Sequence, residues 1–393
     1  MRIVGQLEGA SLLDRARSCA AVAAQHADSV DRDGRFPREA VEALKAERLL
    51  GVLVPAELGG EGAGLADAAE ICAVLGQACA ATAMIFAMHQ IKLSSVVAHG
   101  ADSPWHCELM SRVASEQLLF ASSTTEAGIG GDLRNSLCAI VPEGDQVRVE
   151  KDATVISYGQ FADAILLTAR RGPEAPSSDQ VLTVLLNGQY DLEQTTVWDT
   201  LGMRGTCSDG WRLKACAPAV QILPKPFADI AAQSMLATSH LLWSSLWYGI
   251  AVDAVARAQA FVKAEARKRP DATPPGAQRL TEAVLMLQQS KAAILDGLAR
   301  YETASGSAEA LSSVGFAVAM NNLKLTVSRQ VLEIIDHAML VCGIMGYKNG
   351  TPFSLGRHLR DAHSARIMIS NDRIQSNTAN LLLMHRQDAG LRA

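Results

Sequence analysis

The stretch Thr125-Glu126-Ala127-Gly128-Ile129-Gly130-Gly131-Asp132 lies where the pattern of the sequence changes. Upstream of it, residues 11–118 form Ala-rich segments with apolar residues three and four apart, which is typical of helices that bury one face. Downstream of it come short β-prone runs, such as Ala164–Thr168 and Val181–Leu186, separated by turns that contain Gly and Pro. The stretch therefore lies near the predicted junction between a helical part and a part made of strands.

Helical periodicity returns at Phe227 and continues in long segments to the end of the chain. Breaks fall at Pro270–Gly276 and at Gly343–Gly356, which are rich in Pro and Gly. The order helix, strand, helix predicts an α+β protein. We expect an N-terminal helical domain at residues 1–118, a middle β-barrel or sandwich domain at 119–226 and a C-terminal four-helix bundle at 227–393.

The composition argues against several classes of protein. The 393 residues include 36 basic and 41 acidic side chains, for a net charge of −5, without a basic stretch of the kind that binds nucleic acid. The eight cysteines form no C-x-x-C pair and no Cys/His spacing, so we expect reduced thiols and no metal. The N-terminus lacks the pattern of a secretory signal, which predicts a cytoplasmic protein.

Two uncharged stretches, Ile71–Ile91 and Ile230–Val252, are about as long as a bilayer-spanning helix of ~20 residues. Both are rich in small or polar residues and lack the density of Leu, Ile and Phe that favours insertion. We therefore expect buried helices of a bundle and no insertion into a membrane.

A series of motifs, in one order along the chain, resembles the acyl-CoA dehydrogenase superfamily. Leu50–Leu65 resembles its apolar run followed by Pro and a Gly-rich turn, and Thr125–Asp132 resembles its Thr-Glu-Pro-x-Ala-Gly-Ser-Asp motif. The further matches are Val155-Ile156-Ser157, Gly202–Thr206, Gly249-Ile250-Ala251 at what resembles a helix start, Arg267 with Gln278, Gly343–Tyr347, Arg360-Asp361-Ala362 and Ile374-Gln375. The resemblance extends from about Arg38 to Leu383.

The resemblance implies FAD bound between the middle domain and the C-terminal bundle, in a homodimer or homotetramer whose subunits share the flavin site. Hydroxyls and N–H groups suit a reduced flavin, which gains negative charge, and Arg267 with the turn at Gly343 suits a neighbouring subunit's pyrophosphate. The residues expected to bind the cofactor are Ser122, Ser123, Thr124, Thr125, Gly130, Gly131, Val155, Ile156, Ser157, Arg267, Gln278, Gly343, Gly346, Asn371 and Arg373.

The pattern breaks at the catalytic base. Dehydrogenases of the family use a Glu to remove a proton beside the thioester carbonyl, and the resemblance places Ile369 at that position. The alternative position for this Glu, on an earlier helix, is Ser239, so it is also without a carboxylate. His240, where the family shows an Arg, is the first candidate for a replacement base, since imidazole titrates near pH ~6.5. Asp372 and His89 are further candidates, although packing or solvated roles are commoner for such residues.

The implied function is that of an FAD-dependent oxidoreductase acting on an acyl-CoA or an acyl-carrier-protein thioester, with an electron-transfer partner or oxygen as acceptor. The absent Glu leaves two alternatives open: a flavin-dependent monooxygenase of the same fold, and a catalytically silent flavoprotein subunit. The cofactor motifs also depart from the family, because Pro270-Asp271 stands in place of Phe-Gly and Leu340 in place of a Gln near the adenine.

Overall fold

The computed structural model describes residues 10–130, 132–268 and 270–386. The N-terminal helices are α1 (Leu12–Asp33), α2 (Arg38–Ala46), α3 (Leu65–Ala78), α4 (Ala80–His99) and α5 (Pro104–Glu116). The Ser11 hydroxyl caps α1 by accepting from the Asp14 N–H at 3.2 Å, and Gly34 ends it with φ of 60°. The helical pattern of the first 118 residues therefore corresponds to real helices.

Strands follow from Phe120 to Pro218 and, among the described residues, form two sheets. One has the order β1 (Phe120–Ser123), β4 (Ala164–Arg170), β5 (Gln180–Leu186), with β1 parallel to β4. The other has the order β2 (Val141–Glu143), β3 (Gln146–Ala153), β7 (Gly210–Pro218), β6 (Tyr190–Thr196) and is antiparallel. Side chains of β3 alternate between buried and exposed, because only one face of that sheet is covered.

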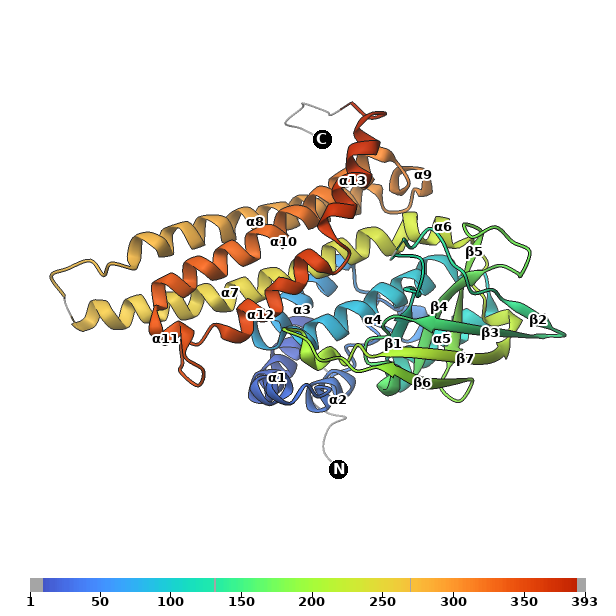
Figure 1. Ribbon diagram of the computed structural model, residues 1–393, viewed down its shortest axis with the longest axis horizontal. Coiled ribbons are helices and arrows are strands. Elements are labelled where there is room, and N and C mark those ends of the chain that lie inside the picture. The colour runs from blue at the N-terminus through green and yellow to red at the C-terminus, as the bar shows by residue number, and fades with distance from the viewer. Residues whose placement is uncertain (1–9, 131, 269, 387–393) are drawn as a thin grey trace.

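The C-terminal part is built on three long helices that run side by side (Figure 1). They are α7 (Leu236–Lys268), α8 (Ala277–Ala304) and α10 (Val314–Cys342). The fourth position of the bundle is shared by α12 (Gly356–Ile367) and α13 (Asn371–Leu382), which both pack on α10. Short helices α6 (Phe227–Ile230), α9 (Ala308–Leu311) and α11 (Ile344–Tyr347) connect these elements.

The two uncharged stretches are buried, as expected, but the first is not one helix. Residues 71–91 are divided between α3 and α4 at Cys79, whose φ of −150° and ψ of 110° are extended. Among the described residues, α4 is the one helix long and apolar enough to span a membrane, and 89% of its apolar window is buried inside the protein. It is therefore a core helix of the fold.

Gly249 does not start a helix, contrary to the expectation from its motif, but lies in the middle of α7. A Cβ atom there would lie 2.3 Å from the Ala73 carbonyl oxygen, and one on Gly76 of α3 would lie 2.4 Å from that of Leu246. The glycines let the backbones of α3 and α7 approach more closely than any side chain would permit. The motif thus marks a contact between two helices.

Two other motifs join the three parts of the chain. The Asp361 carboxylate accepts the Met203 N–H at 2.7 Å, and Gly202 lies against the Arg360 carbonyl. The Arg360 Nη1 donates to Asp31 of α1 at 2.8 Å. Burial raises the pKa of Asp361 to about 6. These residues hold the strand-rich part against the first and last helices, so their presence in the motifs has a structural reason.

Candidate functional site

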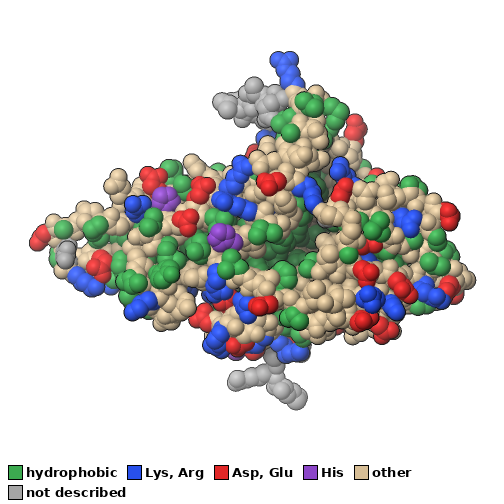
Figure 2. Space-filling model, in the orientation of Figure 1, with side chains coloured by type: hydrophobic (Ala, Val, Ile, Leu, Met, Phe, Trp, Pro, Cys, Tyr) green, Lys and Arg blue, Asp and Glu red, His purple; other side chains and the backbone are tan. Residues whose placement is uncertain are grey.

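A hollow lined by hydrophobic side chains opens between the strand-rich part and the C-terminal helices, below α13 (Figure 2). Two of the segments that the sequence analysis selected for the flavin ring, at Thr125 and at Val155, meet in the strand-rich part. The Thr125 hydroxyl donates to the Val155 carbonyl oxygen at 3.2 Å. The Ser157 and Ser208 hydroxyls are 2.8 Å apart, and Ser208 is equally close to the Thr206 hydroxyl. Three chain segments, at Thr125, at Ser157 and at Thr206–Ser208, thus bring hydroxyls together.

The end of β1 adds further polar groups. The Ser122 and Thr124 hydroxyls are 3.4 Å apart, while the buried Ser123 hydroxyl has no hydrogen-bond partner in the described part of the chain. Ile156 is fully buried beside Ser157. Because side chains alternate along a strand, the buried Ser123 hydroxyl faces away from the half-buried Ser122, which leaves Ser122 and Thr124 as the hydroxyls open to a ligand here.

Glu126 of the same motif has a structural task that the sequence did not reveal. Its carboxylate accepts the N–H groups of Cys138 at 2.7 Å and of Leu137 at 3.1 Å. Lys151 of β3 lies 4.0 Å away and donates to the Ser123 carbonyl oxygen at 3.1 Å. This buried pair fixes the end of β1 from behind.

Helices α7, α10 and α13 bring three buried residues, His240, Asn321 and Thr378, into one hydrogen-bonded relay. Thr378 donates its hydroxyl hydrogen to the Ile374 carbonyl at 2.7 Å and accepts from the Asn321 amide nitrogen at 3.0 Å. The Asn321 amide oxygen therefore faces His240 Nε2, at 3.3 Å. Because an amide oxygen only accepts, this arrangement assigns the hydrogen to Nε2 and leaves Nδ1 as a lone-pair acceptor.

Nδ1 of His240 is buried and has no partner in the described part of the chain. Burial, aided by the nearby Lys324 charge, lowers the pKa of His240 to about 4, so the ring is neutral at pH 7. The hydroxyl of Ser239 is engaged with the Leu236 carbonyl at 2.7 Å. Of the two residues expected to act on the substrate, His240 has an available atom and Ser239 donates to its own helix.

Ile369 lies in the turn between α12 and α13, with φ of 46°. A β-branched residue rarely adopts this left-handed conformation. The turn is held by the Lys324 amine of α10, which donates to the Ile369 carbonyl at 2.7 Å and to the Asn371 amide oxygen at 2.6 Å. Burial lowers the pKa of Lys324 to about 8. Lys324 could not be identified from the sequence, because a lone Lys in a helix resembles a surface residue.

Two buried tryptophans of α7 lie beside His240 and Lys324. Lys324 Nζ lies 5.7 Å from the Trp247 ring, and the rings of Trp243 and Trp247 are 6.5 Å apart. Their indole N–H groups are buried without partners in the described residues. These two buried rings therefore pack the interior beside His240 and Lys324 and leave two indole donors without partners there.

The other two candidate bases do not reach this hollow as free groups. Both ring nitrogens of His89 are used, since Nδ1 accepts the Phe120 N–H at 2.9 Å and Nε2 lies 2.8 Å from the Leu50 carbonyl oxygen. Asp372 is exposed and lines an outer cleft of about 450 Å³ with Arg329, Glu333 and Arg366. His89 is thus a packing residue that joins α4 to β1.

The residues expected to bind the flavin's phosphates fall into two groups that lie far apart in the structure. Arg373 donates to the Gly130 carbonyl, which brings these two together beside the hollow, whereas Gly131 lies outside the described residues. Arg267 and Gln278 are exposed where α7 turns into α8, and the Gly343–Gly346 turn follows α10. These lie at the opposite end of the molecule from the strands (Figure 1). A single chain does not bring them to the hydroxyls described above.

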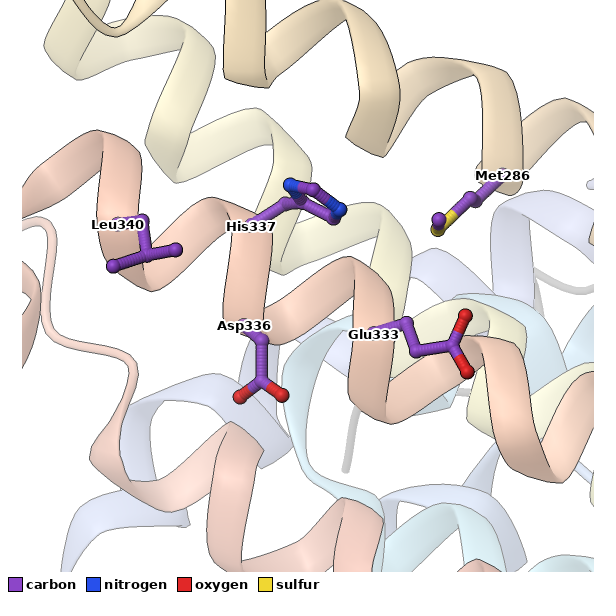
Figure 3. A pocket seen from close by; sticks show the side chains of 5 residues that line it. All are labelled: Met286, Glu333, Asp336, His337 and Leu340. Atoms are coloured by element: carbon purple, nitrogen blue, oxygen red, sulfur yellow. The ribbon is translucent and has the colours of Figure 1, made fainter.

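A groove of about 240 Å³ lies on the outer face of α8 and α10, next to this second group. It is lined by Met286 of α8 and by Glu333, Asp336, His337 and Leu340 of α10, and Figure 3 shows His337 and Glu333 extending toward the side of Met286 while Asp336 points away from it. The groove carries two carboxylates and no Lys or Arg among its lining residues. Its electrostatic character is therefore unfavourable for a pyrophosphate.

Two family models match the chain. The description "Acyl-CoA dehydrogenase, N-terminal domain" matches residues 8–104, and "Acyl-CoA dehydrogenase, C-terminal domain" matches residues 230–380. Together they match well over half of the sequence. The chain belongs to the acyl-CoA dehydrogenase family, a family of flavin-dependent oxidoreductases, as its motifs predicted.

Individual relatives carry differing activities. The chain is 30% identical to a cyclohex-1-ene-1-carbonyl-CoA dehydrogenase of Geobacter metallireducens over 47% of its own length and 48% of that protein. The matched region thus spans about half of this relative. It is 25% identical to the amino sugar nitrososynthase DnmZ of Streptomyces peucetius, over 86% of this chain and 84% of that one.

The whole fold is shared with a solved flavoprotein. The FMN-bound structure of TdsC, a dibenzothiophene monooxygenase of Paenibacillus sp. A11-2, matches with a TM-score of 0.83 at 19% identity, over 96% of this chain and 98% of that one. The predicted fold, with N-terminal helices, central sheets and a C-terminal helical part, is confirmed.

Proposed function

We propose that the chain is a flavin-dependent monooxygenase, which uses reduced flavin and oxygen to oxidise a small substrate held against α7. The observation that carries the proposal is the absence of a carboxylate at the predicted base position. Ile369 stands there, and none of the hydrogen bonds made by Ser239, His240 or Lys324 within the described residues goes to an acidic side chain. Without a positioned base, α-proton removal loses roughly 10²–10⁴-fold in rate.

The residues of the hollow suit the proposed chemistry. A bound flavin would supply the electrons and the activation of oxygen. Hydroxyls and backbone of Ser122–Thr125 and Val155–Ser157 would hold the ring, while Ile369 would keep the space above it apolar and exclude water. Neutral His240 would accept a hydrogen bond from an N–H or O–H of the substrate at Nδ1. The likeness to a nitrososynthase over 86% of this chain and the fold shared with a monooxygenase support this assignment.

We further propose FMN in place of the FAD expected from the motifs. The segments that resemble the family's cofactor motifs carry Pro270-Asp271 in place of Phe-Gly and Leu340 in place of a Gln near the adenine, and the adjoining groove is acidic through Glu333 and Asp336. A neighbouring subunit's pyrophosphate would meet two carboxylates there. TdsC, which shares the fold, binds FMN. Fluorescence titration of the apoprotein should therefore give tighter binding of FMN than of FAD.

The control for the cofactor proposal is a variant that removes both carboxylates, Glu333→Gln with Asp336→Asn. This variant should bind FAD more tightly than the unmodified protein does and should bind FMN equally well. The difference in affinity between the two flavins should therefore become smaller. Equal or tighter binding of FAD by the unmodified protein would overturn the choice of FMN.

The monooxygenase proposal is tested by mixing the oxidised, flavin-loaded protein anaerobically with a panel of acyl-CoAs while flavin absorbance is followed. We expect no bleaching. The Ile369→Glu variant should bleach with at least one acyl-CoA, because it restores a carboxylate at the predicted position, and Ile369→Gln, of matched size, should not. With a reductase that supplies reduced flavin, the unmodified protein should consume oxygen and form an oxygenated product.

The second candidate is dehydrogenation of an acyl-CoA or acyl-carrier-protein thioester, which the 30% identical CoA dehydrogenase favours. Its base would be the Lys324 amine, whose lowered pKa of about 8 makes it a moderate base near neutral pH. Bleaching of the unmodified protein by an acyl-CoA, abolished in Lys324→Met, would establish this reaction instead. A flavin that responds neither to acyl-CoA nor to oxygen would indicate the silent subunit.

A further inference from the structure

The outer cleft of about 450 Å³ beside α13, which we call the α13 cleft, holds two arginines that have no acidic partner. Within the described part of the chain, neither Arg329 of α10 nor Arg366 of α12 makes an ion pair. Instead, Arg366 Nη2 donates to the Arg329 main-chain carbonyl at 3.5 Å, so two cations border one cleft. The other residues that line it are Glu333, Asn371, Asp372 and Gln375.

The spacing of Arg329 and Glu333 would allow an ion pair, yet the two side chains stay apart. On α5, Arg112 and Glu116 have the same order and the same four-residue spacing, and there Arg112 Nε lies 2.9 Å from the carboxylate. Glu333 also lines the groove of Figure 3, where its side chain extends toward the side of Met286. The Arg329 guanidinium therefore keeps its N–H donors for another partner.

The remaining carboxylate of the α13 cleft, that of Asp372, lies in the first turn of α13. The Ser370 side chain does not cap this helix, so the first N–H groups have no side-chain acceptor. Because these N–H groups carry partial positive charge, they offset the charge of Asp372. Two guanidinium groups then outweigh one carboxylate, and the cleft attracts an anion.

The α13 cleft adjoins a segment that is expected to bind the flavin. Asn371 lines the cleft, and Arg373, two residues further along α13, donates to the Gly130 carbonyl of the Thr125–Asp132 motif. Cleft and motif therefore meet at the start of α13. The segment expected at the phosphates, with Arg267 at the end of α7, lies instead at the opposite end of the molecule (Figure 1).

We propose that Arg329 and Arg366 bind the phosphate group of FMN in the α13 cleft. This inference rests on the proposed function, which places a flavin ring against the strand-rich part beside α13. A guanidinium presents N–H groups in a planar fork that matches two phosphate oxygens. A bound phosphate also offsets the repulsion between the two neighbouring cations. The site lies within one chain, so the phosphate needs no arginine from a neighbouring subunit, unlike the arrangement that the family resemblance implied.

The test is fluorescence titration of the apoprotein with FMN and with riboflavin, which has the same ring without the phosphate. At pH 7 and constant ionic strength, we expect FMN to bind at least about tenfold more tightly. In the variant with Arg329→Gln and Arg366→Gln, the affinity for FMN should fall to that for riboflavin. Riboflavin should bind this variant as it binds the unmodified protein, which would show that the ring site is intact.

Inorganic phosphate provides a second measurement at the same cleft. Sodium phosphate, compared with sodium chloride at the same ionic strength, should weaken the binding of FMN and leave that of riboflavin unchanged. The control variant carries Arg112→Gln and Arg300→Gln, which remove two exposed arginines that form ion pairs on α5 and α8. It should retain the preference for FMN, although its net charge changes by the same amount.

Equal affinities of the unmodified protein for FMN and riboflavin would overturn the proposal. If inorganic phosphate then still raised the unfolding midpoint, the cleft would hold the phosphate of a substrate and the assignment to the flavin would be wrong. A preference for FMN that survives in the Arg329 and Arg366 variant would place the phosphate elsewhere. Because the titration measures binding without turnover, its failure would leave the acyl-CoA and oxygen tests unaffected, and its success would stand if acyl-CoA bleached the flavin.

Discussion

At the scale of single residues, two buried groups lack an ordinary polar partner: the His240 Nδ1 has none in the described part of the chain, and the Lys92 amine contacts a thioether sulfur. Both depend on neighbours far away in the sequence. His240 is oriented by Asn321 and Thr378, and Lys92 faces Met235. The motif comparison identified His240 because it stands at a family position, but nothing in the sequence joined it to Asn321.

The relay predicts one tautomer of His240. Nitrogen-15 NMR of ring-labelled protein, with His240 assigned from the His240→Gln variant, should show the hydrogen on Nε2. Because the pKa is lowered to about 4, the ring should stay neutral from pH 8 down to about pH 5. Thr378→Val removes the acceptor for the Asn321 amide and should yield a mixture of tautomers. A hydrogen on Nδ1 in the unmodified protein, or titration near pH 6.5, would contradict the relay.

Lys92 predicts how stability depends on pH. Its pKa is about 7 in the folded protein, against an ordinary value of 10.5, so between these values the unfolded chain binds a proton that the folded chain does not. The free energy of unfolding should therefore rise with pH in this window, by at most about 1.4 kcal/mol per unit from this group. The contribution of Lys92 to the free energy of unfolding is gained as pH rises above 7 and lost as pH falls towards 7.

Chemical denaturation at pH 7.5, 8.5 and 9.5 would measure this contribution. Lys92→Met should show a shallower slope than the unmodified protein, while Lys291→Met, at an exposed position of α8, should follow the unmodified protein. If the free energy of unfolding depended on pH in the same way in all three proteins, Lys92 would be protonated in the folded state. It would then have an acidic partner that the contacts described above do not include.

At the scale of elements, the sequence predicted those whose signal is local. Strands β4 and β5 were visible as apolar runs, and the long helices as periodic ones. The division of residues 71–91 at Cys79 escaped notice because the sequence there, Ala78-Cys79-Ala80, has no Gly or Pro. The π-helical turn could not be predicted from the sequence either. Its residues are ordinary helix formers, and packing decides the conformation of their backbone.

The contact of α3 with α7 makes a prediction at this scale. Gly249→Ala places a methyl group against the Ala73 carbonyl, and Gly76→Ala places one against that of Leu246. Each should destabilise the protein by about 1–3 kcal/mol in urea unfolding, since the helices must separate to admit the new atom. Gly172→Ala, which meets nothing within 4 Å, is the matched control and should change stability little. Undiminished stability in both helix variants would show that the crossing is looser than described.

At the scale of the whole molecule, the outer face of α10 and α11 is apolar where a partner is expected. Leu340, Ile344 and Tyr347 are 60%, 66% and 75% exposed, and they adjoin the groove of Figure 3. Exposed apolar side chains that cluster in this way mark interaction surfaces. We propose that this face joins copies of the chain into a dimer or tetramer, as the family resemblance implied.

Sedimentation analysis of the flavin-loaded protein should accordingly give a mass of two or four chains. The variant with Leu340→Glu and Ile344→Glu should dissociate, because charges would be buried at the interface. Leu285→Glu, at a half-exposed position of α8, serves as the control for a general effect of added charge. A monomeric unmodified protein would refute the assembly and would require the flavin site to be completed within one chain.

The position of α7 has a consequence for how the protein unfolds. This helix packs along α10 on one side and along α3 on another, so the first and last thirds of the sequence share a single apolar interior. Neither third retains that interior when the other is removed. Cleavage of the native chain by a protease should consequently yield no surviving C-terminal fragment, and melting should be a single sharp event in calorimetry.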